Sequence, residues 1–164
     1  GQLAPPFEIY SLNQKAKIRL TDLYREKPLV LIFSSWGCDI FRESLGGLTA
    51  LHTKFQKQAN FAMVYTREIH SMGGFASYLG RVEDPATFEE RVAVASRAKA
   101  QMQLPFPVLV DSIDDRVTTR YGGLPVRAFV IDTKGKVLYA GDQGPWGYKP
   151  YAGFIHHGQR VIAR

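Results

Sequence analysis

Residues 28–41, PLVLIFSSWGCDIF, join an apolar run to the beginning of a helical pattern. The run PLVLIF (28–33) is apolar at successive positions, which is typical of a central strand covered by helices on both faces. After Cys38, apolar residues recur at spacings of three and four up to Phe55, which predicts an amphipathic helix over 41–55. Cys38, the only cysteine in the chain, therefore lies where a buried strand passes into a helix.

The other segments alternate between strand-like and helical patterns. Thr87 and Glu90 form a capping box at the start of one helix, and Gly135 lies in the turn of a late hairpin. The order of elements predicts an α/β fold with a mixed central sheet flanked by helices, and 1–164 as a single domain. The other expected strands are 7–12, 17–20, 61–66, 106–111, 126–132 and 136–142, and the other expected helices are 21–27, 87–102, 112–122 and 149–162.

Composition limits the function only broadly. The net charge of +6 is spread along the chain without a dense run of Lys or Arg, so we expect no nucleic-acid partner. One cysteine excludes an internal disulfide and a cysteine-rich metal site, and we expect no metal. The longest uninterrupted apolar run, 29–33, is too short to span a bilayer. The chain begins GQLAPPF rather than with Met, so we expect a trimmed chain that has lost any signal peptide or anchor, and localisation stays open.

Two interpretations of Cys38 are open. A free cysteine is often a small buried hydrophobe. At the start of a helix, however, unpaired N–H groups and the positive end of the helix dipole face the sulfur, which lowers the thiol pKa and favours the reactive thiolate.

A second feature is Pro125 in GGLPVRAFVID, directly before an expected strand. A proline at such a place is often cis, and an ordinary strand-entry proline is the alternative.

Together these features resemble the thioredoxin superfold, in which the active cysteine begins the first long helix beside a cis-proline loop. The motif of thioredoxin itself is absent, because a CxxC motif needs a second cysteine at Ser35 or Phe41. The peroxiredoxin pattern also fits poorly, since Leu31 stands where that pattern has proline.

A closer resemblance is to the iodothyronine deiodinases, selenoenzymes of the same superfold. FSSWGCDIF (33–41) is similar to their Phe-Gly-Ser-Cys-Thr-Sec-Pro-Pro-Phe segment, with Cys38 in the place of selenocysteine. VYTREIH (64–70) is similar to Ile/Val-Tyr-x-Glu-Glu-Ala-His, which brings Glu68 and His70 into register.

Three further segments carry the same resemblance, which runs from about residue 28 to 155. TFEERVAVA (87–95) is similar to the family's Leu-Glu-Asp-Arg-Val segment, and YGGLPVRAFVI (121–131) to Tyr-Gly-Ala-Leu-Pro-Glu-Arg-Leu-Tyr-Val-Ile. GPWGY (144–148) matches Gly-Pro-Trp-x-Tyr. The resemblance implies a thioredoxin-like domain with an N-terminal β-hairpin extension, as in peroxiredoxin-like proteins.

The resemblance also implies a reductive dehalogenation of iodinated phenols. Cys38 is then the nucleophile, as thiolate, and His70 the proton donor. Glu68 lies two residues before His70, a spacing that on a strand places both side chains on one face. No bound cofactor is expected, but an external thiol must regenerate Cys38.

Other residues are expected to bind substrate or support the thiolate. Arg127 is a cation that could hold an anionic substrate or lower the pKa of Cys38. Trp36 offers an apolar wall, whereas Trp146 is expected to be plain packing. Ser35 and Pro125 complete the expected site residues, which are Cys38, His70, Glu68, Ser35, Trp36, Pro125 and Arg127.

The sequence departs from the family pattern at several positions. Sulfur replaces selenium at Cys38, Pro85 stands at the family's second histidine, and Trp36 at its accessory cysteine. Asp39 and Ile40 replace Pro-Pro, and the Asp39 carboxylate should oppose thiolate formation.

Two alternatives therefore stay open beside the deiodinase-like oxidoreductase, which is the enzyme interpretation we favour. One is a one-cysteine thiol peroxidase, a peroxiredoxin-like antioxidant enzyme reduced by an external thiol. The other is a non-enzymatic domain that binds through the fold. The expected partners are a small-molecule substrate, either a halogenated aromatic or a peroxide, and a thiol reductant; the sequence leaves a homodimer open.

Overall fold

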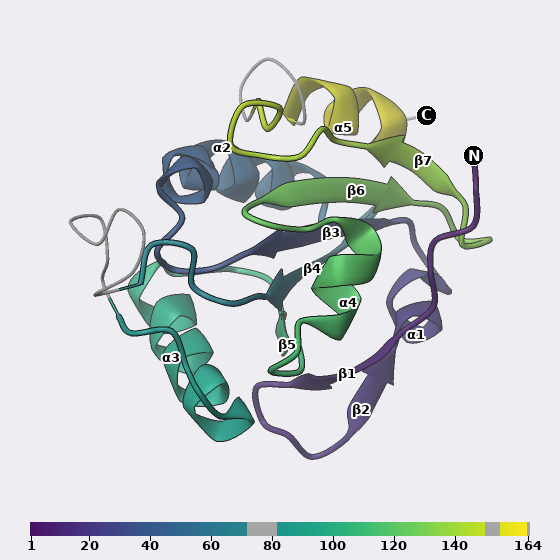
Figure 1. Ribbon diagram of the computed structural model, residues 1–164. Helices are drawn as coiled ribbons and strands as arrows, with labels where there is room; N and C mark the ends of the chain where they lie inside the picture. The colour runs from purple at the N-terminus through teal and green to yellow at the C-terminus, as the bar shows by residue number, and fades with distance from the viewer. Residues whose placement is uncertain (72–81, 150–154, 164) are drawn as a thin grey trace.

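The computed structural model describes residues 1–71, 82–149 and 155–163. Its strands form one seven-stranded sheet in the order β2-β1-β5-β4-β3-β6-β7, with helices on both faces (Figure 1). The strands are β1 (Glu8–Ser11), β2 (Lys17–Arg19), β3 (Leu29–Ser34), β4 (Asn60–Tyr65), β5 (Val108–Val110), β6 (Arg127–Ile131) and β7 (Val137–Ala140). The helices are α1 (Leu20–Tyr24), α2 (Asp39–Phe55), α3 (Phe88–Gln101), α4 (Arg116–Tyr121) and α5 (Ile155–Ile162).

The sheet is mixed. β3, β4 and β5 run parallel to one another, whereas β6 pairs antiparallel with β3 and β7 antiparallel with β6. At the other edge, the N-terminal hairpin of β1 and β2 adds to β5 in antiparallel register. The predicted α/β fold with a mixed sheet and an N-terminal hairpin is therefore confirmed.

Alternate residues of the central strand β3 face two separate cores. Val30 and Ile32 belong to the core that α2, α3 and α5 cover, and Cys38 lies in this core. Leu31 and Phe33 belong to the opposite core, which α1 and α4 cover. The face of the sheet on which a side chain lies therefore decides whether it can approach Cys38.

The predicted element boundaries need some correction. β4 ends at Tyr65, so residues 66–70 form a loop rather than the end of a strand. α1 has only five residues, and β5 begins after Pro107, which cannot donate to the sheet. α5 begins at Ile155; the first residues of the helix expected over 149–162 include 150–154, which lie outside the described residues. The capping box of α3 is present, because Thr87 accepts from the N–H of Glu90.

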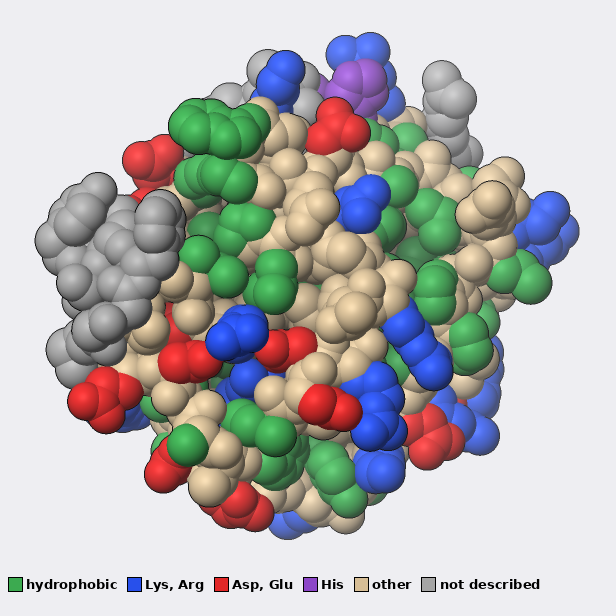
Figure 2. Space-filling view, viewed as in Figure 1, with side chains coloured by type: hydrophobic (Ala, Val, Ile, Leu, Met, Phe, Trp, Pro, Cys, Tyr) green, Lys and Arg blue, Asp and Glu red, His purple; other side chains and the backbone are tan. Residues whose placement is uncertain are grey.

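The described residues hold no helix that combines the length and the apolar character needed to cross a bilayer. Nor do they place three or more His, Cys, Asp or Glu side chains where these could share a metal ion. On the face seen in Figure 2, Lys and Arg side chains are interspersed with Asp and Glu side chains.

Candidate active site

Cys38 is the N-cap residue of α2 and is only 3% exposed. Its N–H donates to the carbonyl of Ser35 at 3.3 Å, and its own carbonyl accepts from the N–H of Arg42 at 3.1 Å. The thiol is thus held in a tight turn between β3 and α2, as the sequence predicts.

The pKa of the Cys38 thiol is nevertheless raised, which corrects the expectation of a lowered value. Burial is the largest cause, because it disfavours the charged thiolate. The N–H groups of Phe41 and Ile40 at the start of α2 do lower the pKa of the thiol, as does the hydroxyl of Ser34, but they do not offset the causes that raise it. The Asp39 carboxylate raises the pKa further, as expected. The free protein therefore holds Cys38 mainly as the neutral thiol at neutral pH.

Glu68 is buried and fastens the loop that precedes Cys38. Its Oε2 accepts from the N–H of Gly37 at 2.8 Å, and its Oε1 accepts from the hydroxyl of Tyr65. The Tyr65 hydroxyl also accepts from the N–H of Trp36, at 3.0 Å. Sequence patterns did not predict this role for Tyr65, which only its place in the VYTREIH motif (64–70) connects to the site.

Burial also raises the pKa values of Glu68 and Tyr65. The pKa of Glu68 is raised by burial, although the hydrogen bonds from Tyr65 and Gly37 act in the opposite direction. The pKa of Tyr65 is raised well above its ordinary value by burial and by the neighbouring carboxylate. Tyr65 is therefore a hydrogen-bond donor to Glu68 over the whole physiological pH range.

His70 follows Glu68 in the loop after β4 and is half-buried. Its main chain lies against Gly37: a Cβ at Gly37 would be 2.9 Å from Glu68 Oε2 and 3.4 Å from the carbonyl oxygen of His70. The structure therefore brings the Glu68–His70 segment to the Cys38 loop. The two residues do not share a strand face, however, because β4 ends before them.

Two serine hydroxyls lie inside this arrangement. The Oγ atoms of Ser34 and Ser35 are buried and have no hydrogen-bond partner of good geometry among the described residues. Ser35 is nevertheless close enough to Glu68 to lower the pKa of that carboxyl group, and Ser34 acts likewise on Cys38. Ser35 was expected at the site, whereas Ser34 was not.

The peptide bond between Leu124 and Pro125 is cis. The loop around Gly144 packs against this segment: the N–H of Gly144 donates to the carbonyl of Val126 at 2.9 Å. Val126 and Tyr148 belong to the same core as Cys38, and ionised Cys38 would raise the pKa of Tyr148. The GPWGY segment therefore reaches the site through Tyr148. Trp146, expected to be packed, is 90% exposed.

Arg127 does not support the thiol. Its side chain shares a face with Phe129, as expected, but this face belongs to the core covered by α1 and α4. The guanidinium donates to the carbonyls of Gly141 at 2.7 Å and Tyr121 at 2.9 Å, so it joins α4 to the end of β7. The expectation that Arg127 lowers the pKa of Cys38 is wrong, because the sheet separates the two side chains.

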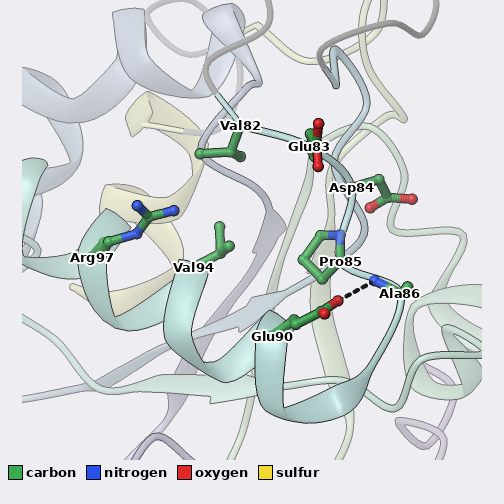
Figure 3. A pocket seen from close by; sticks show the side chains of 8 residues that line it. All are labelled: Val82, Glu83, Asp84, Pro85, Ala86, Glu90, Val94 and Arg97. Atoms are coloured by element: carbon green, nitrogen blue, oxygen red, sulfur yellow. Dashed lines mark hydrogen bonds between the residues drawn. The ribbon is translucent and has the colours of Figure 1, made fainter.

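Trp36 is half-buried, and a cavity lies between α3 and residues 82–86 (Figure 3). The guanidinium of Arg97, on α3, lies 5.8 Å from the centroid of the Trp36 ring. Arg97 and Pro85, the residue in the place of the family's second histidine, both line a cavity of about 500 Å³. The sequence did not single out Arg97.

The family model described as iodothyronine deiodinase matches residues 1–152. The chain belongs to the iodothyronine deiodinase family. It is 29% identical over 151 residues to a type I iodothyronine deiodinase of Xenopus laevis and 31% identical over 152 residues to a thyroxine 5-deiodinase of Gallus gallus. These alignments cover 92% and 91% of this chain but only 59% and 58% of the relatives. This deiodinase-family chain thus spans about three fifths of their length.

Solved structures show the fold of this deiodinase-family chain. The thioredoxin domain of a thiol-disulfide oxidoreductase from Bacteroides vulgatus has a TM-score of 0.68 at 17% identity, covering 99% of this chain and 96% of that one. A secreted disulfide oxidoreductase of Mycobacterium tuberculosis has a TM-score of 0.65 at 16% identity, covering 96% and 94%. The predicted thioredoxin-like fold is therefore confirmed.

Proposed function

We propose that this protein is a thiol-dependent oxidoreductase that removes iodine from iodinated phenols, with Cys38 as the nucleophile. The observation that carries the proposal is the hydrogen bond from the Gly37 N–H to Glu68. It joins the loop of the buried thiol to the segment that holds His70, which supports the proposal that a nucleophile and a proton donor act at one site.

The reaction balances as follows. Cys38 attacks the iodine, the carbon–iodine bond breaks, and the aromatic carbon takes a proton, which leaves Cys38 as a sulfenyl iodide. A first external thiol displaces iodide and forms a mixed disulfide with Cys38, and a second releases Cys38 as the thiol. One iodinated phenol is thus reduced, and two external thiols are oxidised to a disulfide.

The roles of the neighbouring residues follow from their places. His70 is the proton donor to the carbon, since an imidazole ring can donate an N–H proton. Glu68 and Tyr65 are positioning residues, because they hold the N–H groups of Gly37 and Trp36 and so the loop before Cys38. Burial raises the pKa of the Cys38 thiol, so the proposed reaction requires the thiol proton to pass to a base when the sulfur attacks the iodine.

The geometry favours this function over a thiol peroxidase. A peroxidase needs a cation beside the thiolate, and the candidate for that role is Arg127. Arg127 lies on the other face of the sheet, bonded to the carbonyls of Tyr121 and Gly141. The structure therefore offers no cation at Arg127 to support a peroxidatic thiolate.

The test measures iodide release from 4-hydroxy-3-iodobenzoate with dithiothreitol as the reductant. We expect release that depends on the thiol, is abolished in Cys38→Ser and falls about 100-fold in His70→Ala, the effect of losing a general acid. Arg127→Lys is the matched control and should keep the wild-type rate. Rapid peroxide consumption without iodide release would support the thiol peroxidase instead. If the protein shows neither activity, the non-enzymatic binding domain is the interpretation that remains.

A further inference from the structure

We propose that Ser34 is a further catalytic residue, whose hydroxyl donates a hydrogen bond to the Cys38 sulfur once the thiol has lost its proton. Its role in turnover rests on the proposed function, because it assumes that Cys38 is the nucleophile. The hydrogen bond itself does not depend on turnover and is tested without it. Ser34 stands where the deiodinase segment Phe-Gly-Ser-Cys-Thr-Sec has glycine, so this donor is a feature of the present chain.

Ser34 lies on the face of the sheet that holds Cys38. It is the last residue of β3, and alternation along the strand places it on the face of Val30 and Ile32. These two residues belong to the core that contains Cys38. The partner of Ser34 in the parallel pair with β4 is Tyr65, which belongs to the same core. Ser34 therefore approaches the thiol from the strand, whereas α2 presents its N–H groups from the helix.

The Ser34 hydroxyl lacks a good partner in the resting protein. Ser34 is fully buried, and its Oγ has no hydrogen bond of good geometry among the described residues. Two other hydroxyls of this core are engaged elsewhere. Tyr65 donates to Glu68, and the Tyr148 hydroxyl pairs with that of Ser44 at 3.3 Å. A buried hydroxyl without a partner destabilises a protein, so its presence needs a physical reason.

The chemistry of sulfur supplies such a reason. A neutral thiol is a weak acceptor, so the hydroxyl gains little from it. A thiolate is an anion, and a hydrogen bond to an anion is about twice as strong as one between neutral groups. Burial raises the pKa of the Cys38 thiol overall, and a hydrogen bond from Ser34 acts in the opposite direction. The hydroxyl is therefore poorly paired beside the thiol and well paired beside the thiolate.

The titratable and charged groups on the segments around the thiol do not replace this donor. They are Asp39 and Arg42 on α2, Glu68 and His70 in the loop after β4, and Tyr148 after β7. Burial is the main cause that raises the pKa of the Cys38 thiol, and Asp39, which pairs with Arg42, raises it further. Burial also raises the pKa of Tyr148, which stays neutral. The groups that lower the pKa of Cys38 are instead hydrogen-bond donors, namely Ser34 and the N–H groups at the start of α2.

Such a donor acts at both ends of the proposed reaction. At the start it stabilises the Cys38 thiolate that attacks the iodine. At the end a second external thiolate attacks the outer sulfur of the mixed disulfide, the S–S bond breaks, and Cys38 leaves with the electron pair. A thiolate of lower pKa leaves faster, so the same hydrogen bond favours the release of Cys38.

The test removes the hydroxyl and follows the ionisation of Cys38. Ultraviolet absorbance of the thiolate is titrated in Ser34→Ala and Ser34→Gly, and the same variants carrying Cys38→Ser are subtracted. We expect both midpoints to rise by about one pH unit, the size of a hydrogen bond to a charged group. Ser96→Ala is the control, because this serine on α3 bonds to the carbonyl of Val92, and it should leave the midpoint unchanged.

Alkylation by iodoacetamide is the second measurement. Cys38 forms a thioether, iodide leaves, and the thiol proton goes to the buffer. At a pH below both midpoints, the rate should fall about fourfold in Ser34→Ala, because a tenfold loss of thiolate is partly offset by the higher nucleophilicity of a more basic one.

Stability separates this role from a structural one. The hydroxyl has no good partner beside a neutral thiol, so Ser34→Ala should unfold at neutral pH at the wild-type urea concentration or above it. Ser44→Ala is the contrast, because the buried Ser44 hydroxyl donates to the carbonyl of Phe41 at 2.7 Å. Its removal should lower the urea midpoint.

The inference is overturned if either Ser34 variant keeps the wild-type ionisation midpoint, or if Ser34→Ala destabilises the protein as Ser44→Ala does. None of these results depends on turnover. A raised midpoint in a protein that releases no iodide would support the hydrogen bond and refute the proposed function. Iodide release with an unchanged midpoint would do the reverse.

Discussion

The main-chain N–H of Gly37 donates to Glu68 Oε2 at 2.8 Å, across 31 positions of sequence. This bond ties the turn before Cys38 to the loop that follows β4. Glycine is needed there, because a Cβ would lie 2.9 Å from the same carboxylate oxygen. The two family motifs that carry the thiol and the histidine thus meet through one residue without a side chain.

Gly37→Ala should therefore damage the site. The added methyl group forces Glu68 or the main chain of His70 to move, so we expect a loss of about 1–3 kcal/mol in the free energy of unfolding and a clear fall in iodide release. Urea unfolding measures the change in the free energy of unfolding. Gly46→Ala is the control: its Cβ meets nothing within 4 Å in the middle of α2, so it should stabilise by about 1 kcal/mol. Equal effects of the two substitutions would refute the steric role of Gly37.

Tyr65→Phe should weaken the same connection. Without the hydroxyl, Glu68 Oε1 loses its donor and the N–H of Trp36 loses its acceptor. A buried polar group left unpaired costs about 1–3 kcal/mol, so the melting temperature should fall by several degrees. Tyr139→Phe, at a half-buried tyrosine on β7, should have a smaller effect. A variant at position 65 as stable as wild type would show that the hydroxyl is dispensable.

Alkylation of Cys38 by iodoacetamide should be slow at pH 7 and accelerate with a midpoint above that of a free cysteine. The sign follows from burial, which favours the neutral thiol and raises its pKa. Asp39→Asn should lower the midpoint, because the Asp39 carboxylate raises the pKa of the thiol. Asp114→Asn, at an exposed carboxylate in the loop before α4, should not shift the midpoint. A midpoint below that of free cysteine would contradict the buried, neutral thiol.

Arg91→Met should destabilise the protein strongly. Arg91 is 1% exposed and pairs with Asp115 at 2.7 Å, and Asp115 also accepts from the N–H of Arg67, next to Glu68. Removing one partner of a buried ion pair costs about 3–5 kcal/mol. Arg116→Met breaks an exposed pair and should cost about 0–1 kcal/mol. A loss below 1 kcal/mol for Arg91→Met would contradict the importance of the pair.

Periodicity predicted much of the fold. The apolar run of β3 and the spacing from Phe41 to Phe55 placed Cys38 at the start of α2, because both signals are local. Glu68 was different: a charge in a loop is usually exposed, and the burial of Glu68 depends on the Tyr65 hydroxyl and on the main-chain N–H of Gly37, 31 positions away in sequence.

Arg127 and the Cys38 pKa escaped prediction for related reasons. Strand alternation placed Arg127 on the same face as Phe129. It could not tell which face of the sheet is covered by α2, the helix that begins after Cys38. The helix-end effect on Cys38 is local and was foreseen, whereas its burial comes from packing against several elements and is the larger cause. Sequence reasoning therefore failed where tertiary packing decides the outcome.

The most direct test of the proposed chemistry is a reaction of 4-hydroxy-3-iodobenzoate with fully reduced protein and no added thiol. If Cys38 accepts the iodine, one equivalent of 4-hydroxybenzoate per protein should form and the reaction should then stop, to resume when dithiothreitol is added. Cys38→Ser protein should form none. No deiodinated product from the wild-type protein, or the same amount from Cys38→Ser, would contradict a deiodination at Cys38.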